Sequence, residues 1–304
     1  TTLIWVSVDL AGFNKRESDQ LRSELSDRYS IAKEAVTISF THTHSGPEYD
    51  SVSPFFGTEK AAVPGYMDFV HAQILKAVEK CFENGFEEVQ AYASTLQIEG
   101  CYGNRNGKDK PADKSLTTIE FRSGERIVGG ILHFTCHPTV LGPQNLFVSG
   151  DLAGYLSRAL QQRWGVYPLV MQGAAGDMSN RLYRQNNDFN ELKRVSSGIA
   201  RQISQFDTKL DLTLAHPQSK TFVFPIEYDP DIDVLKARLA DSQAKLEQAA
   251  AYDERKWLIS EINGFQRKIK AGHVKMDLEA TILRMQDLEI VVLPCELVSA
   301  FGRQ

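Results

Sequence analysis

Short apolar runs rich in β-branched residues recur along the chain, and longer stretches with helical periodicity separate them. Such runs predict buried strands, and they occupy residues 3–10, 35–43, 89–98, 117–122, 127–136, 168–172, 278–285 and 288–293, with a β pair expected at 210–227. Helices are predicted at residues 18–29, 66–84, 151–164 and 190–206. Because strands alternate with helices, the sequence predicts an α/β fold in which helices flank a mixed β-sheet core.

Residues 231–270 have a different composition, rich in Ala, Leu, Lys, Glu and Gln. They carry two apolar stripes at helical spacing, formed by Ile232, Leu235, Leu239 and Leu246 and by Trp257, Ile262, Phe265 and Ile269. Two such stripes predict an antiparallel helical hairpin with its hinge near residues 251–253. A role as a partner surface or substrate lid is the alternative to a packed or protruding hairpin.

No repeat and no Ser/Pro-rich linker divides the chain. We therefore expect one α/β catalytic domain over residues 1–304, with the hairpin inside it. The chain opens on strand-like sequence without Met and stops abruptly. We expect the native protein to extend beyond both ends, where any signal peptide or further domain would lie.

The composition excludes several classes of protein. The 304 residues are 42% hydrophobic and 24% charged, which argues against disorder. With 34 Lys and Arg against 39 Asp and Glu, the net charge is −5, and no long basic run supports nucleic-acid binding. The longest apolar stretches are about ten residues, too short to cross a bilayer. None of the four cysteines forms a C-x-x-C pair, so no cysteine-rich zinc module is indicated.

Two histidines follow the second predicted strand. Alternate strand residues share a face, so the three apolar side chains of this strand would point the same way as His42 and His44. A buried face that ends in two imidazoles before a Gly-Pro turn suits a metal ligand and an acid–base partner. The alternative is a hydrogen-bonded core histidine without a role in catalysis.

A similar arrangement ends the strand predicted at residues 127–136. His133, Thr135 and His137 would share one face, and His137 lies at the strand end just before Pro138. His133 lies deeper in the strand, which favours a structural role. Asp151 is expected to cap the following helix, and a second role in orienting a site histidine is the alternative.

Two further segments place polar residues after apolar strands. The turn at residues 173–180 carries Asp177, Ser179 and Asn180, but it lacks the motifs of a P-loop and of a serine hydrolase. Glu296 is the first acid after the last strand, where a plain helix-start carboxylate is the alternative. Ligands in open α/β sheets bind at the carboxyl ends of strands. Two histidines, a carboxylate and an open position for water form a catalytic zinc ligand set.

Several motifs also resemble those of the neutral/alkaline (non-lysosomal) ceramidases, and they occur in the family's order. The most specific is Thr-His-Thr-His-Ser-Gly-Pro at residues 41–47. The others are Asn104-Arg105, Asp113-Lys114, Cys136-His137 with Ser-Gly-Asp-x-x-Gly-Tyr at 149–155, Gly-Asp-Met-Ser at 176–179, and Pro-Cys-Glu at 294–296 with Gly302-Arg303. The resemblance spans nearly the whole chain.

The resemblance implies a zinc-dependent amidohydrolase that converts an N-acyl sphingoid or related lipid amide to a fatty acid and an amine. By motif position, the protein ligands of the Zn²⁺ would be His42, His137 and Glu296. In the family a tyrosine well beyond the Glu segment completes the metal site, and we expect it beyond residue 304. His44 and Arg105 would stabilise the oxyanion or handle protons, and Ser179 would lie in the substrate pocket.

Further properties follow from the resemblance alone. It implies a role in lipid and sphingolipid metabolism, a secreted or periplasmic location, and peripheral membrane contact without a transmembrane segment. It gives no oligomeric state.

The chain departs from the family mainly on the substrate side. Ser-Asn-Arg at residues 179–181 stands where ceramidases typically have Ser-Pro-Asn, and Gly-Pro-Glu-Tyr at 46–49 replaces Gly-Pro-Gly-Gly. Two alternatives therefore stay open. One is a metal-dependent hydrolase of a different amide or ester, and the other is a non-catalytic binding protein on the same fold.

Overall fold

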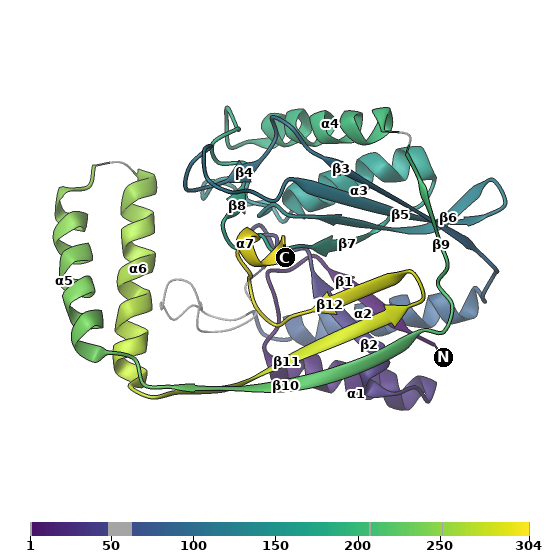
Figure 1. Cartoon of the computed structure of the whole chain (residues 1–304), viewed down its shortest axis with the longest axis horizontal. Coiled ribbons are helices and arrows are strands. Elements are labelled where there is room, and N and C mark those ends of the chain that lie inside the picture. Colours follow the sequence, from purple (N-terminus) through teal and green to yellow (C-terminus); the bar gives the residue numbers. More distant parts are fainter. Residues whose placement is uncertain (1, 48–62, 207, 251, 304) are drawn as a thin grey trace. The chain divides into compact units, whose positions relative to one another are not determined.

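A computed structural model describes residues 2–47, 63–206, 208–250 and 252–303 (Figure 1). The chain forms two compact units. The first comprises Thr1–Pro47, His71–Thr221 and Thr281–Gln304, and the second comprises Glu48–Val70 and Phe222–Ala280. Every residue proposed above for the zinc site or for catalysis belongs to the first unit.

A five-stranded mixed sheet forms the centre of the first unit. Its strand order is β7 (Leu169–Gln172), β6 (Arg126–Phe134), β5 (Ser115–Ser123), β3 (Gln90–Gln97) and β9 (Leu210–Leu212). The β6–β7 pair is parallel, whereas the other pairs are antiparallel. The predicted mixed α/β class is confirmed. The β pair predicted at residues 210–227 is wrong, because β9 pairs with β3 and not with the strand that follows it.

Two helices cover one face of this sheet (Figure 1), namely α3 (Asp151–Trp164) and α4 (Phe189–Gln205). Their apolar stripes pack on alternate residues of β5 and β6 in the main hydrophobic core, which includes Leu156, Leu160, Val195, Ile199, Leu116, Leu132 and Phe134. A smaller cluster on other strand residues contains Ala91, Ile119 and Ile131, against which Leu288 packs. Both sheet faces are therefore buried, as the apolar runs of the sequence predict.

A parallel two-stranded pair lies beside β7. It consists of β1 (Ile4–Val8) and β2 (Val36–Phe40), joined through α1 (Lys15–Tyr29) and the 3₁₀ turn η1 (Lys33–Ala35). The Ser7 hydroxyl donates to the Val170 carbonyl over 2.7 Å and so links β1 to β7. The carboxyl ends of β2 and β7 lead directly into the segments that carry the predicted site.

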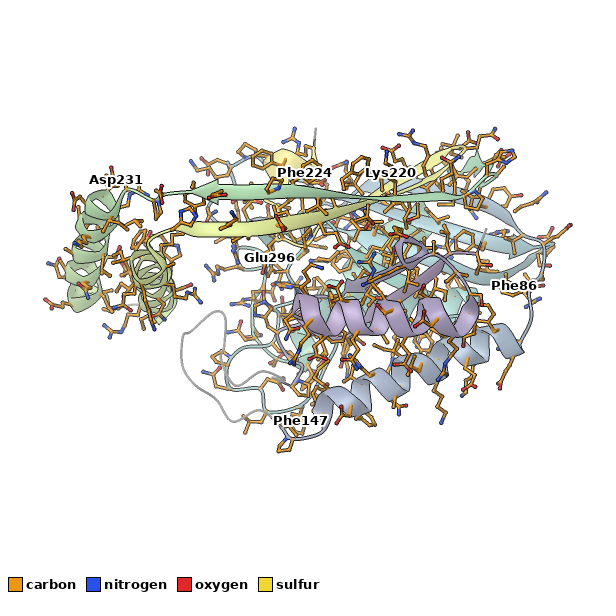
Figure 2. The ribbon with its side chains drawn as sticks, turned by 90° about the horizontal axis from the view of Figure 1, so that it is seen from below. Phe86, Phe147, Lys220, Phe224, Asp231 and Glu296 are labelled. Atoms are coloured by element: carbon orange, nitrogen blue, oxygen red, sulfur yellow. The ribbon has the colours of Figure 1, made fainter. Side chains whose placement is uncertain are left out.

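Glu296 lies in the segment that follows the last strands of the chain. A three-stranded sheet has the order β10 (Gln218–Tyr228), β11 (Val274–Met285) and β12 (Leu288–Val292). After β12 the chain continues into the segment that carries Glu296 and into the short helix α7 (Ser299–Gly302). Figure 2 labels Glu296 on this segment. Three further elements are α2 (Tyr66–Glu83) and the small pair of β4 (Gly103–Asn104) and β8 (Met178–Ser179).

The second unit contains the predicted helical hairpin. Helices α5 (Ile232–Gln248) and α6 (Tyr252–Ala271) lie side by side (Figure 1). The predicted α5 stripe is half-buried, and on α6 the side chains of Leu258 and Ile262 are buried. Trp257 was predicted in the α6 stripe, but 54% of it is exposed. Leu258, the next residue along the helix, occupies the inner face instead.

Candidate metal centre

The first histidine segment begins where β2 ends at Phe40, earlier than predicted. The prediction that His42 and His44 continue the face of the strand is therefore wrong, because the chain leaves the strand conformation before His42. The backbone of His42 has φ of 61° in the left-handed region, which is uncommon for a residue other than glycine. Its N–H donates to the Leu10 carbonyl over 3.1 Å, so the segment docks on the end of β1.

The imidazoles of His42 and His137 are held in the same way. Nδ1 of His42 lies 2.8 Å from the Ala11 carbonyl oxygen, and Nδ1 of His137 lies 2.6 Å from the Ala175 carbonyl oxygen. A carbonyl oxygen only accepts, so Nδ1 carries the hydrogen in both rings. In the neutral tautomer Nε2 is then left with a lone pair, which is the arrangement found for metal-ligating histidines.

Both Nε2 atoms face the carboxylate of Glu296. Oε1 lies 3.1 Å from Nε2 of His42, and Oε2 lies 3.3 Å from Nε2 of His137. Nε2 of His42 is buried and, despite this short distance, makes no aligned hydrogen bond with a described residue. Two lone-pair nitrogens that face two carboxylate oxygens need a proton or a cation among them. The donor set of imidazole nitrogen and carboxylate oxygen therefore fits a divalent ion such as zinc.

The pKa values of these groups follow from this arrangement. His137 and then His42 hold the pKa of the Glu296 carboxyl well below its usual range. Burial acts to lower the pKa of His42, but the Glu296 carboxylate and the Ala11 carbonyl outweigh it and raise that pKa. A carboxylate that stays ionised suits a metal ligand.

His44 contributes a third imidazole to the centre. Its ring centroid lies 5.1 Å from that of His42 and 5.6 Å from that of His137. One ligand atom from each of these three histidines lies within 4.8 Å of the others, so the trio could hold a metal ion. His44 is thus a candidate ligand as well as the predicted proton-transfer group.

The segment after His137 is fixed by Asp151. The Asp151 side chain is fully buried, and its carboxylate accepts the N–H groups of Val140, Leu141 and Leu152. The predicted helix cap is wrong in position, because Gly150 is the N-cap and Asp151 is the first residue of α3. The carboxylate still satisfies one N–H of the first turn, and it also ties the helix to the segment three residues beyond His137.

The turn after β7 connects His137 to the segment of Glu296. It provides the Ala175 carbonyl that holds His137, and the Gly176 N–H donates to the Leu297 carbonyl over 2.7 Å. A Cβ atom on Gly176 would lie 2.8 Å from that carbonyl oxygen, so the approach requires glycine. Asp177 accepts the Ser299 N–H over 2.7 Å. The sequence analysis named Asp177 among the polar residues of this turn, but it did not predict that Asp177 holds the Glu296 segment in place.

Arg105 and Ser179 reach the centre through the β4–β8 pair. The Arg105 N–H donates to the Asp177 carbonyl over 2.8 Å, and its Nη2 donates to the Gly176 carbonyl over 2.5 Å. Ser179 is 3% exposed and forms a parallel bridge with His137. The structure thus gathers all the predicted site residues at one place, namely His42, His44, Arg105, His137, Ser179 and Glu296.

Among the residues that the structure describes, His133 forms no hydrogen bond or ion pair with those of the centre. Burial lowers its pKa, which keeps the ring neutral at neutral pH, as expected for a structural histidine. Its structural role stays a prediction.

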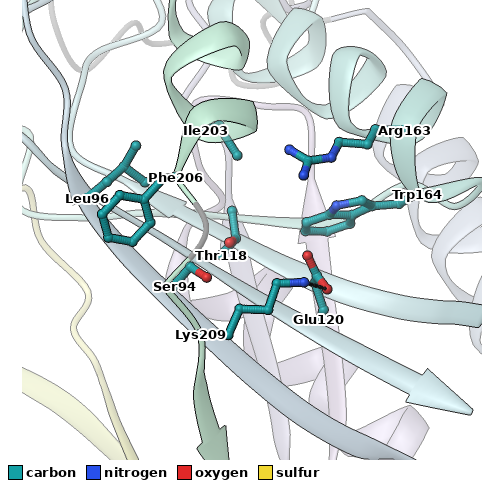
Figure 3. Close-up of a pocket in the computed structure, with 9 residues that line it drawn as sticks. All are labelled: Ser94, Leu96, Thr118, Glu120, Arg163, Trp164, Ile203, Phe206 and Lys209. Carbon is teal, nitrogen blue, oxygen red and sulfur yellow. Dashed lines mark hydrogen bonds and ion pairs between the residues drawn. The ribbon is translucent and has the colours of Figure 1, made fainter. Parts of the chain in front are cut away.

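A separate small cavity lies on the sheet near the end of α3 (Figure 3). It is lined by Ser94, Leu96, Thr118, Glu120, Arg163, Trp164, Ile203, Phe206 and Lys209. Its volume of about 10 Å³ holds at most one water. The Lys209 ammonium lies 2.8 Å from the Glu120 carboxylate that borders it. This cavity is too small to accept an organic substrate.

Among the residues that the structure describes, no helix has the length and apolarity needed to cross a membrane.

Comparison with known proteins gives a likeness in fold. No protein-family model matches the sequence, and no curated protein sequence matches it. A ceramidase complexed with C2 superposes with a TM-score of 0.73 at 15% identity, covering 99% of this chain and 56% of that protein. The neutral ceramidase from Pseudomonas aeruginosa superposes with a TM-score of 0.72 at 15% identity, covering 98% and 55%. The chain thus spans little more than half the length of these ceramidases, and it shares their fold over that part.

Proposed function

We propose that this chain is the catalytic part of a zinc-dependent amidohydrolase that cleaves a lipid amide to a fatty acid and an amine. One observation carries the proposal. Nε2 of His42 and Nε2 of His137 converge on the Glu296 carboxylate, while both Nδ1 atoms donate to backbone carbonyls. This arrangement occurs on a fold shared with ceramidases, and the residues that form it are those of the resembling motifs.

In this proposal His42, His137 and Glu296 hold the zinc ion. Zinc bound there would polarise the amide carbonyl and lower the pKa of a bound water to about 7. The Ala11 and Ala175 carbonyls keep Nε2 of both histidines available, and Asp177 keeps the Glu296 segment in place.

The chain's own groups would then manage charge and protons. Amide hydrolysis needs a proton on the departing nitrogen, and His44 would supply it, which the closeness of its ring to those of His42 and His137 supports. Arg105 stays charged throughout and would stabilise the oxyanion that develops on the carbonyl, an effect worth about 3 to 4 kcal/mol for one good donor. Ser179 would line the substrate pocket beside His137.

A zinc analysis of the native protein, including any residues beyond 304, tests the metal site first. We expect about one zinc per chain by elemental analysis, because the ligand set is that of a single catalytic ion. His42→Ala and His137→Ala should each lose it. His273→Ala is the matched control, because that exposed histidine lies in the second unit and pairs with Asp229 and Glu227.

Hydrolysis is tested next with N-dodecanoylsphingosine and other N-acyl amides, following fatty-acid release. Release that requires both His42 and His137 supports the proposal. A protein that takes up no zinc after incubation with it would contradict the proposal and favour a binding protein on the same fold.

A further inference from the structure

Three consecutive apolar side chains are exposed in the loop between His137 and α3. The exposed fractions are 92% for Leu146, 72% for Phe147 and 74% for Val148, and we call these three residues the apolar tip. Among the described residues, no other exposed large apolar side chains form a run of three. Exposed apolar residues in such a run are unfavourable in water and mark a contact surface.

Hydrogen bonds within the loop fix the backbone of the apolar tip. The Phe147 N–H donates to Oδ1 of Asn145 over 3.2 Å, and Nδ2 of Asn145 donates to the Phe147 carbonyl over 2.8 Å. The Asn145 N–H donates to the Gly142 carbonyl over 3.0 Å and so closes a turn. The ring centroid of Phe147 lies 6.1 Å from that of Phe189, which packs against the main core. The exposed side chains therefore stand on a braced turn.

The same loop is tied to the segment that carries His44. The Thr43 hydroxyl donates to the Ser149 carbonyl over 2.8 Å, and the Ser149 N–H donates to the Ser45 carbonyl over 3.0 Å. Thr43 and Ser45 flank His44 in the sequence, and Ser149 directly follows the apolar tip. A partner that binds the tip therefore comes close to the candidate metal centre.

The size and chemistry of the apolar tip indicate which partner it fits. A stable protein interface takes about 20 to 30 residues from each side, whereas the tip offers three. No residue between Pro138 and Gly150 carries a charge, so the loop can leave water without burying one. Backbone groups that enter hydrocarbon must find partners within the chain, and Asn145 provides both for Phe147. These properties favour the hydrocarbon of a lipid surface over a protein.

We propose that the apolar tip inserts into the surface of a lipid bilayer and docks the protein there, with its candidate metal centre close to the lipid. The contact is hydrophobic and scales with the apolar area buried, so it requires no anionic headgroups. The inference deepens the proposed function, on which it rests for the purpose of the contact: a lipid amide would be taken from the bilayer that holds it. Docking itself requires neither zinc nor turnover.

Sedimentation with vesicles of phosphatidylcholine, a lipid without net charge, measures the docking of the native protein. We expect binding that molar salt does not weaken, because salt screens charges but leaves a hydrophobic contact in place. The triple variant Leu146→Ser, Phe147→Ser and Val148→Ser should bind about a hundredfold more weakly. Urea unfolding that matches the parent protein shows that the triple variant keeps its fold, as expected for exposed positions.

Phe86→Ser is the matched control. Phe86 is 79% exposed, lies well apart from Phe147 in Figure 2, and has Gly85 and Glu87 as its neighbours in the chain. A lone exposed ring of this kind is ordinary on a protein surface. Phe86→Ser should therefore bind vesicles as the parent protein does.

Phe147→Trp distinguishes insertion from an indirect effect of the loop. The indole keeps an apolar ring that suits the membrane interface, so this variant should still bind vesicles. Its fluorescence should shift to shorter wavelength and be quenched by lipids brominated on their acyl chains. Both changes should exceed those of the parent protein, which contains three tryptophans. Equal quenching in the two proteins would contradict insertion of the apolar tip.

The outcomes separate the two proposals. A parent protein that does not bind these vesicles, or a triple variant that binds them equally well, overturns the docking surface and leaves the hydrolase standing. An oligomer that dissociates in the triple variant, without vesicle binding by the parent, also overturns it and makes a second copy the partner. Vesicle binding through the apolar tip, together with no cleavage of any N-acyl amide, overturns the hydrolase and leaves the docking surface standing.

Discussion

At the scale of single residues, His44 has two candidate roles in the centre, as a metal ligand or as the general acid. The three imidazoles lie close enough for His44 to be a third histidine ligand, whereas Glu296 already faces His42 and His137. We predict that His44→Ala retains zinc and loses catalysis by a hundredfold or more, the scale of a positioned general acid of about 10²-fold to 10⁴-fold. Zinc content and kcat measured on the same preparation decide between the roles, and loss of the metal in this variant would make His44 a ligand.

Gly176 is a second residue of the centre at which a short contact distance leads to a prediction. Gly176→Ala would force its new Cβ against the Leu297 carbonyl, which lies 2.8 Å away, and so displace the segment that carries Glu296. We predict at least a tenfold loss of zinc affinity in a competition titration with a chelator. Gly154→Ala is the matched control in α3, because its Cβ would meet nothing within 4 Å. Equal zinc affinity in both variants would show that the segment tolerates the shift.

The residue types of the centre could be predicted from the sequence, but their geometry could not. Histidines and an acid placed after apolar strands indicated His42, His137 and Glu296 correctly as neighbours. The alternating-face argument failed at His42 because the strand ends at Phe40. The carbonyls of Ala11 and Ala175 were beyond prediction, because every residue has a carbonyl and only the fold selects which one meets an imidazole.

At the scale of elements, an ion pair between a buried carboxylate and an exposed lysine joins the middle of β5 to the residue just before β9. Glu120 lies on β5, and its carboxylate accepts Arg122 and Lys209. Burial acts to raise the pKa of Glu120, but Lys209 and then Arg122 outweigh it and lower the pKa. A carboxyl with a lowered pKa stabilises the fold at pH values above its unfolded pKa, and this stabilisation is lost as the pH falls through the folded pKa.

Glu120→Gln is therefore expected to destabilise the protein at pH 7 by about 1 kcal/mol, because the carboxylate is buried but both cationic partners reach solvent. The difference from the parent protein should begin to shrink below about pH 4, where the carboxyl of the unfolded chain takes up a proton, and it should be lost only as the pH falls through the lowered pKa of the folded protein. Urea unfolding of both proteins at pH 7 and at pH 3.5 measures it. A difference that stays constant between the two pH values would mean that the charge of Glu120 contributes nothing.

Sequence patterns predicted some features of these elements and missed others. Both helices of the hairpin were predicted because apolar residues at helical spacing persist over many turns. The exposed Trp257 was wrongly assigned to the buried stripe of α6, because its neighbour Leu258 satisfies nearly the same helical spacing. In the structure the smaller side chain, that of Leu258, packs against α5. The pairing of β9 with β3 was missed because strand periodicity identifies a strand but not its partner.

At the scale of the whole molecule, the division into two units separates the candidate centre from the hairpin. His42, His44, Arg105, His137, Ser179 and Glu296 all belong to the first unit. The hairpin has its own seam, with Leu258 and Ile262 buried and the Ser242 hydroxyl bonded to Glu261. Helices that bury their apolar faces against each other contribute little to the core of the sheet. The expectation of one catalytic domain over residues 1–304 stays a prediction that removal of the hairpin can test.

We predict that a variant of the native protein in which a short Asn-Gly turn replaces residues 231–271 folds and binds zinc at the parent stoichiometry. The reason is that β10 and β11 are already paired in one sheet, and a two-residue turn can join two such strands as a β-hairpin. Zinc content, together with hydrolysis of N-acyl amides, is the measurement. Retained zinc and retained turnover would leave the hairpin as a structural appendage, whereas retained zinc with turnover lost would make it a substrate lid. Loss of zinc would contradict the prediction, because it would mean that the first unit cannot form the centre without the second.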